Sequence, residues 1–157
     1  MGTAASGMRE RWHPWRHLGR EYPHIGVSCL ELLPGRKRAS WTSDGIYLDR
    51  RLGQAERRCA LTHEIVHLER GPVPPQPQLA AREERRVSII AAERLIPLPD
   101  LTAALMWVSL EDPRELAEEL WVDVPTLRIR LRHIASTDLQ HINAELARRR
   151  PWNIVNA

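Results

Sequence analysis

The sequence has few of the features that mark secreted or membrane-spanning proteins. Only two cysteines occur in 157 residues, Cys29 and Cys59, and they do not form a CxxC pair. A small secreted scaffold held by disulfides needs more cysteines, so we expect two reduced thiols. No apolar run approaches the ~20 residues that span a bilayer, and the charged N-terminal stretch lacks the apolar core of a signal peptide. We therefore expect a cytoplasmic protein that has no membrane partner.

Lysine is nearly absent, since Lys37 is the only one among 23 basic residues. The arginines are spread along the chain and alternate with glutamates, and the formal net charge is only +3. A protein that binds DNA through its surface charge concentrates basic residues on one face. The composition therefore supports a nucleic-acid partner only weakly.

The length suits one domain, or one domain with a small appendage, and allows a substantial core. Trp12 and Trp15 could pin an otherwise polar and flexible N-terminal segment to that core. The boundaries we predict are a flexible segment at 1–20, a core at 21–110, C-terminal helices at 111–150 and a tail at 151–157.

The apolar pattern predicts an α+β fold. Three short strands, at 24–33, 39–42 and 46–48, are separated by turn signals and would form a small antiparallel sheet. A helix follows from Gly53 to Arg70 and stops at Gly71-Pro72. The remaining chain is mostly helical, with helices predicted at 79–95, 100–108, 113–121, 125–134 and 137–149. We expect the sheet to pack on the helix that starts at Gly53.

The most informative stretch is HEIVH, from His63 to His67, in the middle of that helix. Residues four apart on a helix lie on one face, ~5–6 Å apart at Cβ. Two imidazoles there can bind one zinc ion at ~2.0–2.1 Å. Glu64 points about a quarter-turn away, where its carboxylate can reach a water at the metal without being a ligand. The alternative interpretation is an amphipathic helix that carries two surface histidines.

Catalytic zinc needs a third protein ligand and an open fourth position. The extended pattern HExxHxxGxxH is not met, so this ligand must come from further along the chain. Small residues in the helix predicted at 79–95 would let it approach the HExxH helix closely. We favour Glu84 in that helix over its neighbour Glu83. His133 and His141 are rivals, although lone helical histidines more often serve the surface or the core.

Two segments together resemble a known family. LTHEIVHLERG followed by AREERRVSIIAAERLIP is similar to the ImmA/IrrE family of bacterial and phage metallopeptidases, over roughly residues 20 to 135. That family pairs the HExxH helix with a later helix of the form Glu-x-x-(Ala/Val)-(Asn/Asp)-x-x-Ala-x-x-x-Leu-(Ile/Met)-Pro. Its places are filled here by Glu84, Val87, Ala91, Leu95, Ile96 and Pro97.

Two positions depart from the family pattern. Ser88 stands where Asn or Asp is usual, which we expect to weaken a contact that supports a ligand. Arg86 stands where many members have a second acid, and this makes Glu84 the better third ligand.

The resemblance implies a zincin-like fold and a zinc-dependent endopeptidase. Zn²⁺ would be held by His63, His67 and Glu84, with Glu64 as the general base. The implied substrate is another protein, such as a helix-turn-helix repressor of phage or stress-response genes, cleaved in the bacterial cytoplasm. The oxyanion-stabilising group stays open between Tyr47 and His133.

The helices predicted at 113–121 and 125–134 also look like half of a helix-turn-helix. The second would present Thr126, Arg128, Arg130 and Arg132. The simpler interpretation is that the leucines of these helices pack them on the core. The alternative function is therefore a DNA-binding or protein-interaction module with a structural or inactive metal site, and a toxin–antitoxin context is a third possibility.

Overall fold

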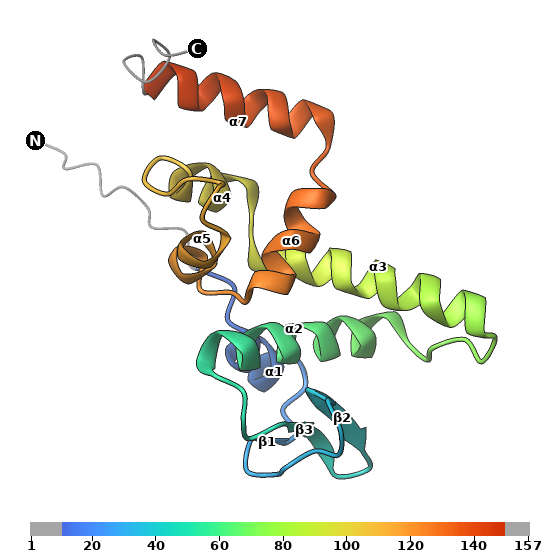
Figure 1. Cartoon of the computed structure of the whole chain (residues 1–157). Coiled ribbons are helices and arrows are strands. Elements are labelled where there is room, and N and C mark those ends of the chain that lie inside the picture. The colour runs from blue at the N-terminus through green and yellow to red at the C-terminus, as the bar shows by residue number, and fades with distance from the viewer. Residues whose placement is uncertain (1–10, 150–157) are drawn as a thin grey trace, which may run out of the picture.

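The structure, a computed structural model, describes residues 11–149. The predictions for residues 1–10 and for the tail 151–157 lie outside this range. The fold is α+β, with a three-stranded sheet on one side of a long helix and further helices on the other (Figure 1). In chain order the elements are α1 (Pro14–Glu21), β1 (Val27–Ser28), β2 (Ala39–Thr42), β3 (Gly45–Leu48), α2 (Gln54–Arg70), α3 (Pro77–Leu95), α4 (Leu98–Ala104), α5 (Pro113–Leu120), α6 (Val124–Arg132) and α7 (Ser136–Arg149).

The sheet is mixed, in the order β1-β3-β2. β2 and β3 form the predicted antiparallel hairpin, but β1 runs parallel to β3, with Val27 opposite Ile46. The prediction of an all-antiparallel sheet is wrong at β1, because the chain crosses to the far side of β3 before the hairpin begins. Gly45 permits this close approach, since its φ is 137° and a Cβ there would collide with the carbonyl oxygen of Gly26.

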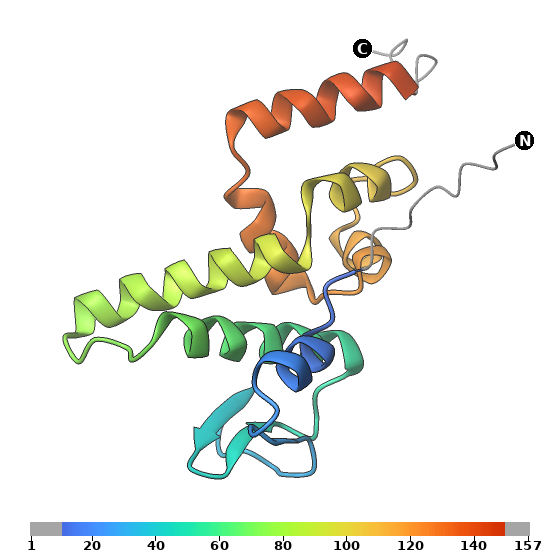
Figure 2. The ribbon, with the colours of Figure 1, turned by 180° about the vertical axis from the view of Figure 1, so that it is seen from behind.

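Helix α2 lies between the sheet and α3, as the two opposite views show (Figures 1 and 2). It begins after Gly53, whose N–H donates to Glu56 Oε2 at 2.8 Å, and ends at Gly71, whose φ is 91°. These are the bounds that the sequence predicts. Ile65 is buried against the sheet, together with Leu48. Within residues 11–149, no helix has both the length and the apolar composition needed to cross a bilayer.

The N-terminal segment is more ordered than predicted. Residues 14–21 form α1, which packs on α2 and buries Leu18. Trp12 anchors the segment as expected, since its Nε1 donates to Thr62 Oγ1 at 2.9 Å, and Trp15 packs against the same core. The prediction of a flexible segment is therefore wrong for residues 14–20. This helix was not predicted from the sequence because it is short and mostly polar.

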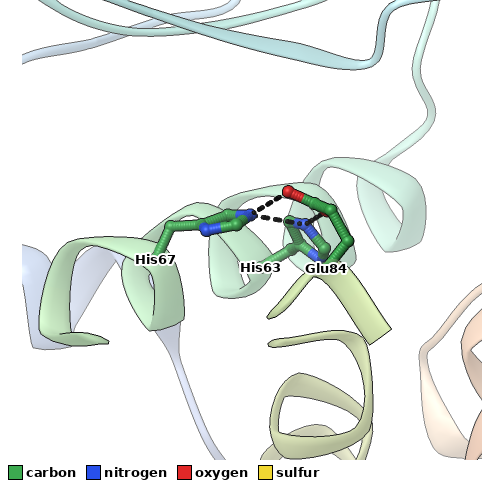
Figure 3. Close-up of side chains that lie close together, drawn as sticks. All are labelled: His63, His67 and Glu84. Carbon is green, nitrogen blue, oxygen red and sulfur yellow. Dashed lines mark hydrogen bonds and ion pairs between the residues drawn. The ribbon is translucent and has the colours of Figure 1, made fainter. Parts of the chain in front are cut away.

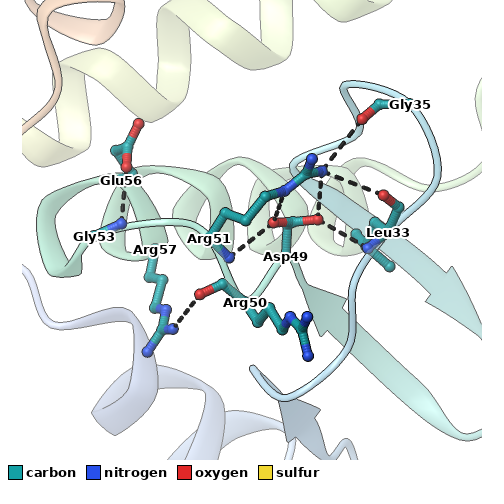
Figure 4. Close-up of polar contacts among 8 residues, drawn as sticks. All are labelled: Leu33, Gly35, Asp49, Arg50, Arg51, Gly53, Glu56 and Arg57. Carbon is teal, nitrogen blue, oxygen red and sulfur yellow. Dashed lines mark hydrogen bonds and ion pairs between the residues drawn. The ribbon is translucent and has the colours of Figure 1, made fainter.

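A buried carboxylate fixes the loop before β2 (Figure 4). Asp49 accepts hydrogen bonds from Leu33 N at 2.8 Å and from Arg51 N and Nε at 2.8 and 2.7 Å. Arg51 also donates from Nη2 to the carbonyl oxygen of Gly35 at 3.2 Å. The Arg51 guanidinium holds the pKa of Asp49 well below its usual range. The cluster ties the loop at 33–35 to the end of β3 and so sets where β2 begins.

The C-terminal helices share a second core with the ends of α2 and α3. Leu101 of α4, Leu116 of α5, Leu127 of α6 and Ile142 of α7 are all buried in it. The leucines therefore pack as the simpler interpretation predicts. The helix bounds lie within a few residues of the predicted ones; the largest difference is α4, which ends at Ala104 because turns take the chain on to Val108.

Arg58 is expected to contribute strongly to stability. Its buried guanidinium donates to the carbonyl oxygens of Trp12 at 3.1 Å and Trp121 at 2.7 Å, and lies over the Trp121 ring. Arg58→Met leaves these carbonyls without a donor, so the free energy of unfolding should fall by about 3 kcal/mol in urea denaturation. Arg57→Met is the matched control, since the hydrogen bond found for its guanidinium within residues 11–149 goes to the exposed carbonyl of Arg50. Equal losses in the two variants would contradict this role.

Candidate metal centre

Three donor side chains converge where α2 and α3 face each other (Figure 3). His63 and His67 project from α2, one turn apart, and Glu84 reaches them from α3. The Nε2 atoms of the two histidines lie 3.2 Å apart. Glu84 Oε1 lies 2.9 Å from His67 Nε2, and its Oε2 lies 3.3 Å from His63 Nε2. The three side chains therefore point at one common position.

The arrangement fits a zinc ion. Ligands bound tetrahedrally at ~2.0–2.1 Å lie about 3.3 Å apart, close to the separations seen here. All the donor atoms of the group lie within 4.8 Å of one another, and it is the one such group found in residues 11–149. Two histidines and a glutamate form a donor set of catalytic zinc, with the fourth position open. All three residues line one open groove, so the site can be reached from solvent.

The neighbouring Glu83 is directed elsewhere. It forms a bidentate ion pair with Arg70, with Oε2 2.9 Å from Nη2, and this pairing lowers the pKa of Glu83. His133 and His141 are not part of the converging group. Of the four candidates for a third ligand, the structure thus brings only Glu84 to the two histidines.

Paired charges hold α3 in register with α2. Arg94 of α3 donates to both carboxylate oxygens of Glu69 on α2, at 3.0 and 2.7 Å. The ring of His17 lies 3.1 Å from the same carboxylate, and Arg94 stacks 4.8 Å from the centre of the Trp12 ring. Together with the ion pair between Arg70 and Glu83, these contacts fix the position of α3 along the axis of α2. They thereby fix the position of Glu84.

Glu64 lies beside the three donors without joining them. Burial raises the pKa of the Glu64 carboxyl, while the charge of His67 and a hydrogen bond with Trp41 act in the opposite direction. Burial, followed by the charge of His67, lowers the pKa of His63. This favours the neutral imidazole, which is the form that binds metals.

The donors lie between an open groove and a smaller cavity. The groove has a volume of ≈ 780 Å³ and runs from β2, at Ser40 and Trp41, past the histidines to Val73. The cavity has a volume of ≈ 230 Å³ and lies on the other side, against α6. Ala39, His63 and Glu64 border both spaces, so the groove and the cavity adjoin each other at these residues.

A family model of the IrrE N-terminal-like domain, peptidase family M78, matches residues 30–132. The chain belongs to this family. The match covers about two thirds of the chain and includes both motif helices, so the resemblance drawn from them is confirmed. No curated protein and no solved structure matches the chain.

One departure from the M78 pattern lies next to the metal centre. Ser88, which replaces the usual Asn or Asp, lines the cavity beside His63. The buried Nδ1 atom of His67 has no hydrogen-bond partner among the described residues. Metal-binding imidazoles are normally oriented by such a partner. The polar contacts of the His67 ring are instead made by Nε2, with Glu84 at 2.9 Å and His63 at 3.2 Å.

The oxyanion candidates are not placed at the site. Neither Tyr47 nor His133 lines the groove or the cavity within the described chain. Trp41, which sequence reasoning missed, lines the groove together with Glu64. Its only signal in the sequence is an aromatic residue in a short strand, which does not distinguish a site residue from a surface one.

The arginines expected on a recognition helix divide into two groups. Arg130 is 6% exposed, and its Nε donates to the carbonyl oxygen of Ile96 at 2.9 Å. Thr126 lines the cavity beside the metal centre. Only Arg128 and Arg132 stay at the surface. Helix α6 is thus built into the M78 domain, and DNA binding by it stays a prediction.

Proposed function

We propose that this chain is a zinc-dependent endopeptidase that cleaves another protein. His63, His67 and Glu84 would hold Zn²⁺, and Glu64 would serve as the general base. One observation carries the proposal: three donor side chains converge at a groove beside the half-buried carboxylate of Glu64, which is not itself a donor. Membership of a peptidase family supports the same reaction class.

The chain's own residues have distinct tasks in this reaction. Zinc, when bound, supplies a Lewis acid that lowers the pKa of water and polarises the scissile carbonyl. Glu64 takes a proton from the attacking water and later delivers it to the leaving amine. Trp41 lines the groove beside Glu64 and acts to lower the pKa of its carboxyl. The ion pairs between α2 and α3 keep Glu84 in place throughout.

The sheet offers a way to hold the substrate. β2 is an edge strand, since the sheet order is β1-β3-β2, and β2 residues line the groove. An extended peptide can add to such an edge through main-chain hydrogen bonds, which fix its register. The substrate we propose is an extended segment of a repressor of phage or stress-response genes in the bacterial cytoplasm. Co-expression with candidate repressors, followed by mass analysis of fragments, tests this; intact repressors throughout would contradict it.

Metal removal should destabilise the protein. The purified protein is expected to carry one zinc per chain by elemental analysis. Removing free zinc held at ~100 times its Kd should lower Tm by roughly 5–10 °C, because a ligand that binds only the folded state stabilises it. The control is a His63→Ala/His67→Ala double variant, whose Tm should not respond to zinc. A wild-type protein that neither contains nor takes up zinc would end the enzyme proposal.

A further inference from the structure

A separate cavity on α1 is lined largely by cationic side chains. It has a volume of ≈ 120 Å³ and lies where the segment before α1 meets the helix. Its lining within residues 11–149 consists of Arg11, Trp12, His13, Arg16, His17 and Arg20. Positions 13, 16, 17 and 20 follow one face of a helix, so α1 supplies a continuous row of nitrogen-bearing side chains. No residue of the metal centre belongs to this lining, and the cavity is therefore a distinct site.

The aromatic part of the lining is held firmly against α2, on which α1 packs (Figure 2). The carbonyl oxygen of Trp12 accepts from Arg58 Nη2 at 3.1 Å, and the Trp12 ring N–H donates to Thr62 at 2.9 Å. The ring of His17 lies against the Trp12 ring, with the two centroids 4.6 Å apart. Arg11 is the chain neighbour of Trp12 and shares its anchorage. A site that is preorganised in this way loses little freedom when it binds a ligand.

The cations of this cavity lack acidic partners in its described lining. No aspartate or glutamate of residues 11–149 lines it. Arg11 donates from Nη2 to the carbonyl oxygen of Glu119 at 3.2 Å, and this neutral acceptor leaves the charge uncompensated. For Arg20 no hydrogen bond or ion pair is found within the described chain. Arg70 and Arg94, in contrast, each pair with a carboxylate.

The uncompensated charge of Arg11 acts on its surroundings. Burial lowers the pKa of Arg58, and the charge of Arg11 acts in the same direction. Like charges around one cavity repel each other, and an anion bound among them replaces this repulsion with attraction. The cavity is therefore suited to an anionic ligand.

The size and the donors of the cavity indicate a single phosphate-type oxyanion. At the ~30 Å³ that each molecule occupies in liquid water, ≈ 120 Å³ holds about four waters, which is room for one tetrahedral oxyanion but not for a nucleoside. Guanidinium groups present paired N–H donors that match the oxygens of phosphate. A nucleic-acid backbone fits less well, because it would continue past two acidic residues. Glu21 follows Arg20 in the chain, and Glu119 contacts Arg11 through its carbonyl.

We propose that the cavity on α1 is a binding site for a phosphate group, carried either by inorganic phosphate or by a small phosphorylated metabolite. Arg11 reaches the phosphate from the segment before α1, and Arg16 and Arg20 reach it from the helix. The site is separate from the peptidase reaction proposed above. Because the cavity exists only in the folded chain, its ligand also stabilises the fold.

Two-dimensional ¹H–¹⁵N NMR on the purified protein, at neutral pH and constant ionic strength, tests the site. Inorganic phosphate should shift the backbone amides of residues 11–20 and the Trp12 indole N–H in a saturable way, with Kd below about 1 mM. Chloride at the same ionic strength should leave these signals in place. Shifts confined to the residues around the metal centre, or no saturable shift, would overturn the site.

A metal ion can itself bind phosphate, so the titration is repeated on a protein that lacks the metal ligands. The His63→Ala/His67→Ala variant should show the same shifts at residues 11–20 and the same affinity as wild type. Loss of the shifts in this variant would mean that phosphate binds at the metal centre, which would overturn the site on α1.

Substitution of two arginines tests which side chains hold the phosphate. Arg11→Gln/Arg20→Gln should weaken phosphate binding by at least about 10-fold, because it removes two charge-assisted hydrogen bonds. Arg128→Gln/Arg132→Gln is the matched control, since it removes the same charge from exposed positions on α6. Affinity in this control should stay within about 2-fold of wild type, because salt screens distant charges. Equal weakening in both double variants would overturn the site. Should Arg11→Gln/Arg20→Gln fail to fold, Arg20→Gln decides alone.

Two further titrations distinguish the sources of the phosphate. Adenosine monophosphate that binds as tightly as inorganic phosphate, with the same shifts, assigns the site to the phosphate group alone. Binding of adenosine monophosphate at least about 10-fold tighter assigns it to a phosphorylated metabolite. A short single-stranded oligonucleotide should bind no tighter than either. An oligonucleotide that binds at least about 10-fold tighter, with shifts extending well beyond α1, would overturn the small-anion site in favour of a nucleic-acid surface.

Discussion

Glu64→Gln is expected to abolish cleavage while leaving zinc in place. Glutamine keeps the size of the side chain but cannot accept a proton from the attacking water. Removing a general base typically costs ~10²–10⁴-fold in rate, so turnover should drop by at least this factor. Zinc should stay bound, because Glu64 is not one of the three converging donors.

Metal content and fragment formation should be measured on the same Glu64→Gln preparation. Elemental analysis is expected to give one zinc per chain, and mass analysis of a co-expressed repressor is expected to show only the intact protein. Glu93→Gln is the matched control, since it makes the same chemical change at an exposed position on α3. Cleavage by Glu64→Gln at the wild-type rate would show that Glu64 is not the general base.

Glu84→Gln and Glu83→Gln should differ sharply in zinc affinity. Glu84 lies 2.9 Å from His67 Nε2, whereas Glu83 is paired with Arg70. Loss of a ligand should weaken zinc binding by more than the ~10–100-fold that is typical for the partners of ligands. Loss of one surface ion pair should weaken it by less than about 5-fold. The two substitutions are identical in chemistry and adjacent in sequence, so each controls for the other.

Competition with a chromophoric chelator gives the two dissociation constants. Circular dichroism should confirm that both variants keep α3. Equal loss in the two variants would mean that the effect comes from the helix and not from coordination. A larger loss of zinc affinity for Glu83→Gln would mean that Glu83, and not Glu84, is the third ligand.

Helix α2 and its histidines could be predicted because their signals are local. Gly53 and Gly71 bound the helix by backbone chemistry, and the four-residue spacing alone places two imidazoles on one face. Glu84 was harder, since Glu83 stands next to it in the same helix and only the small residues of that helix favoured Glu84. The resemblance favoured Glu84, and the physical reason appears only in three dimensions, where Arg70 occupies Glu83.

The features that the sequence did not reveal depend on contacts between distant segments. The parallel pairing of β1 depends on a crossover, and α1 is held by contacts such as the bond from Trp12 to Thr62. The role of Trp41 arises because β2 is brought against α2. Ile129 lies at an apolar position of α6 like any core residue, so its place in the cavity wall could not be told from its spacing.

The C-terminal helices are better understood as part of the site than as an appendage. Pro125, Thr126 and Ile129 close the cavity beside Glu64, and Asp123 joins α6 to Arg38 at the start of β2. The family match ends at residue 132, where α6 also ends. Both observations associate α6 with the matched domain, while the predicted boundary at residue 110 stays a prediction.

X-ray absorption at the zinc edge tests the coordination directly. We predict two imidazole nitrogens and carboxylate oxygen at ~2.0–2.1 Å, with one further oxygen from water and no sulfur. A sulfur shell at ~2.3 Å, which Cys59 one turn before His63 could supply, would contradict this. A spectrum that shows only oxygen from water around the zinc would also contradict the predicted coordination.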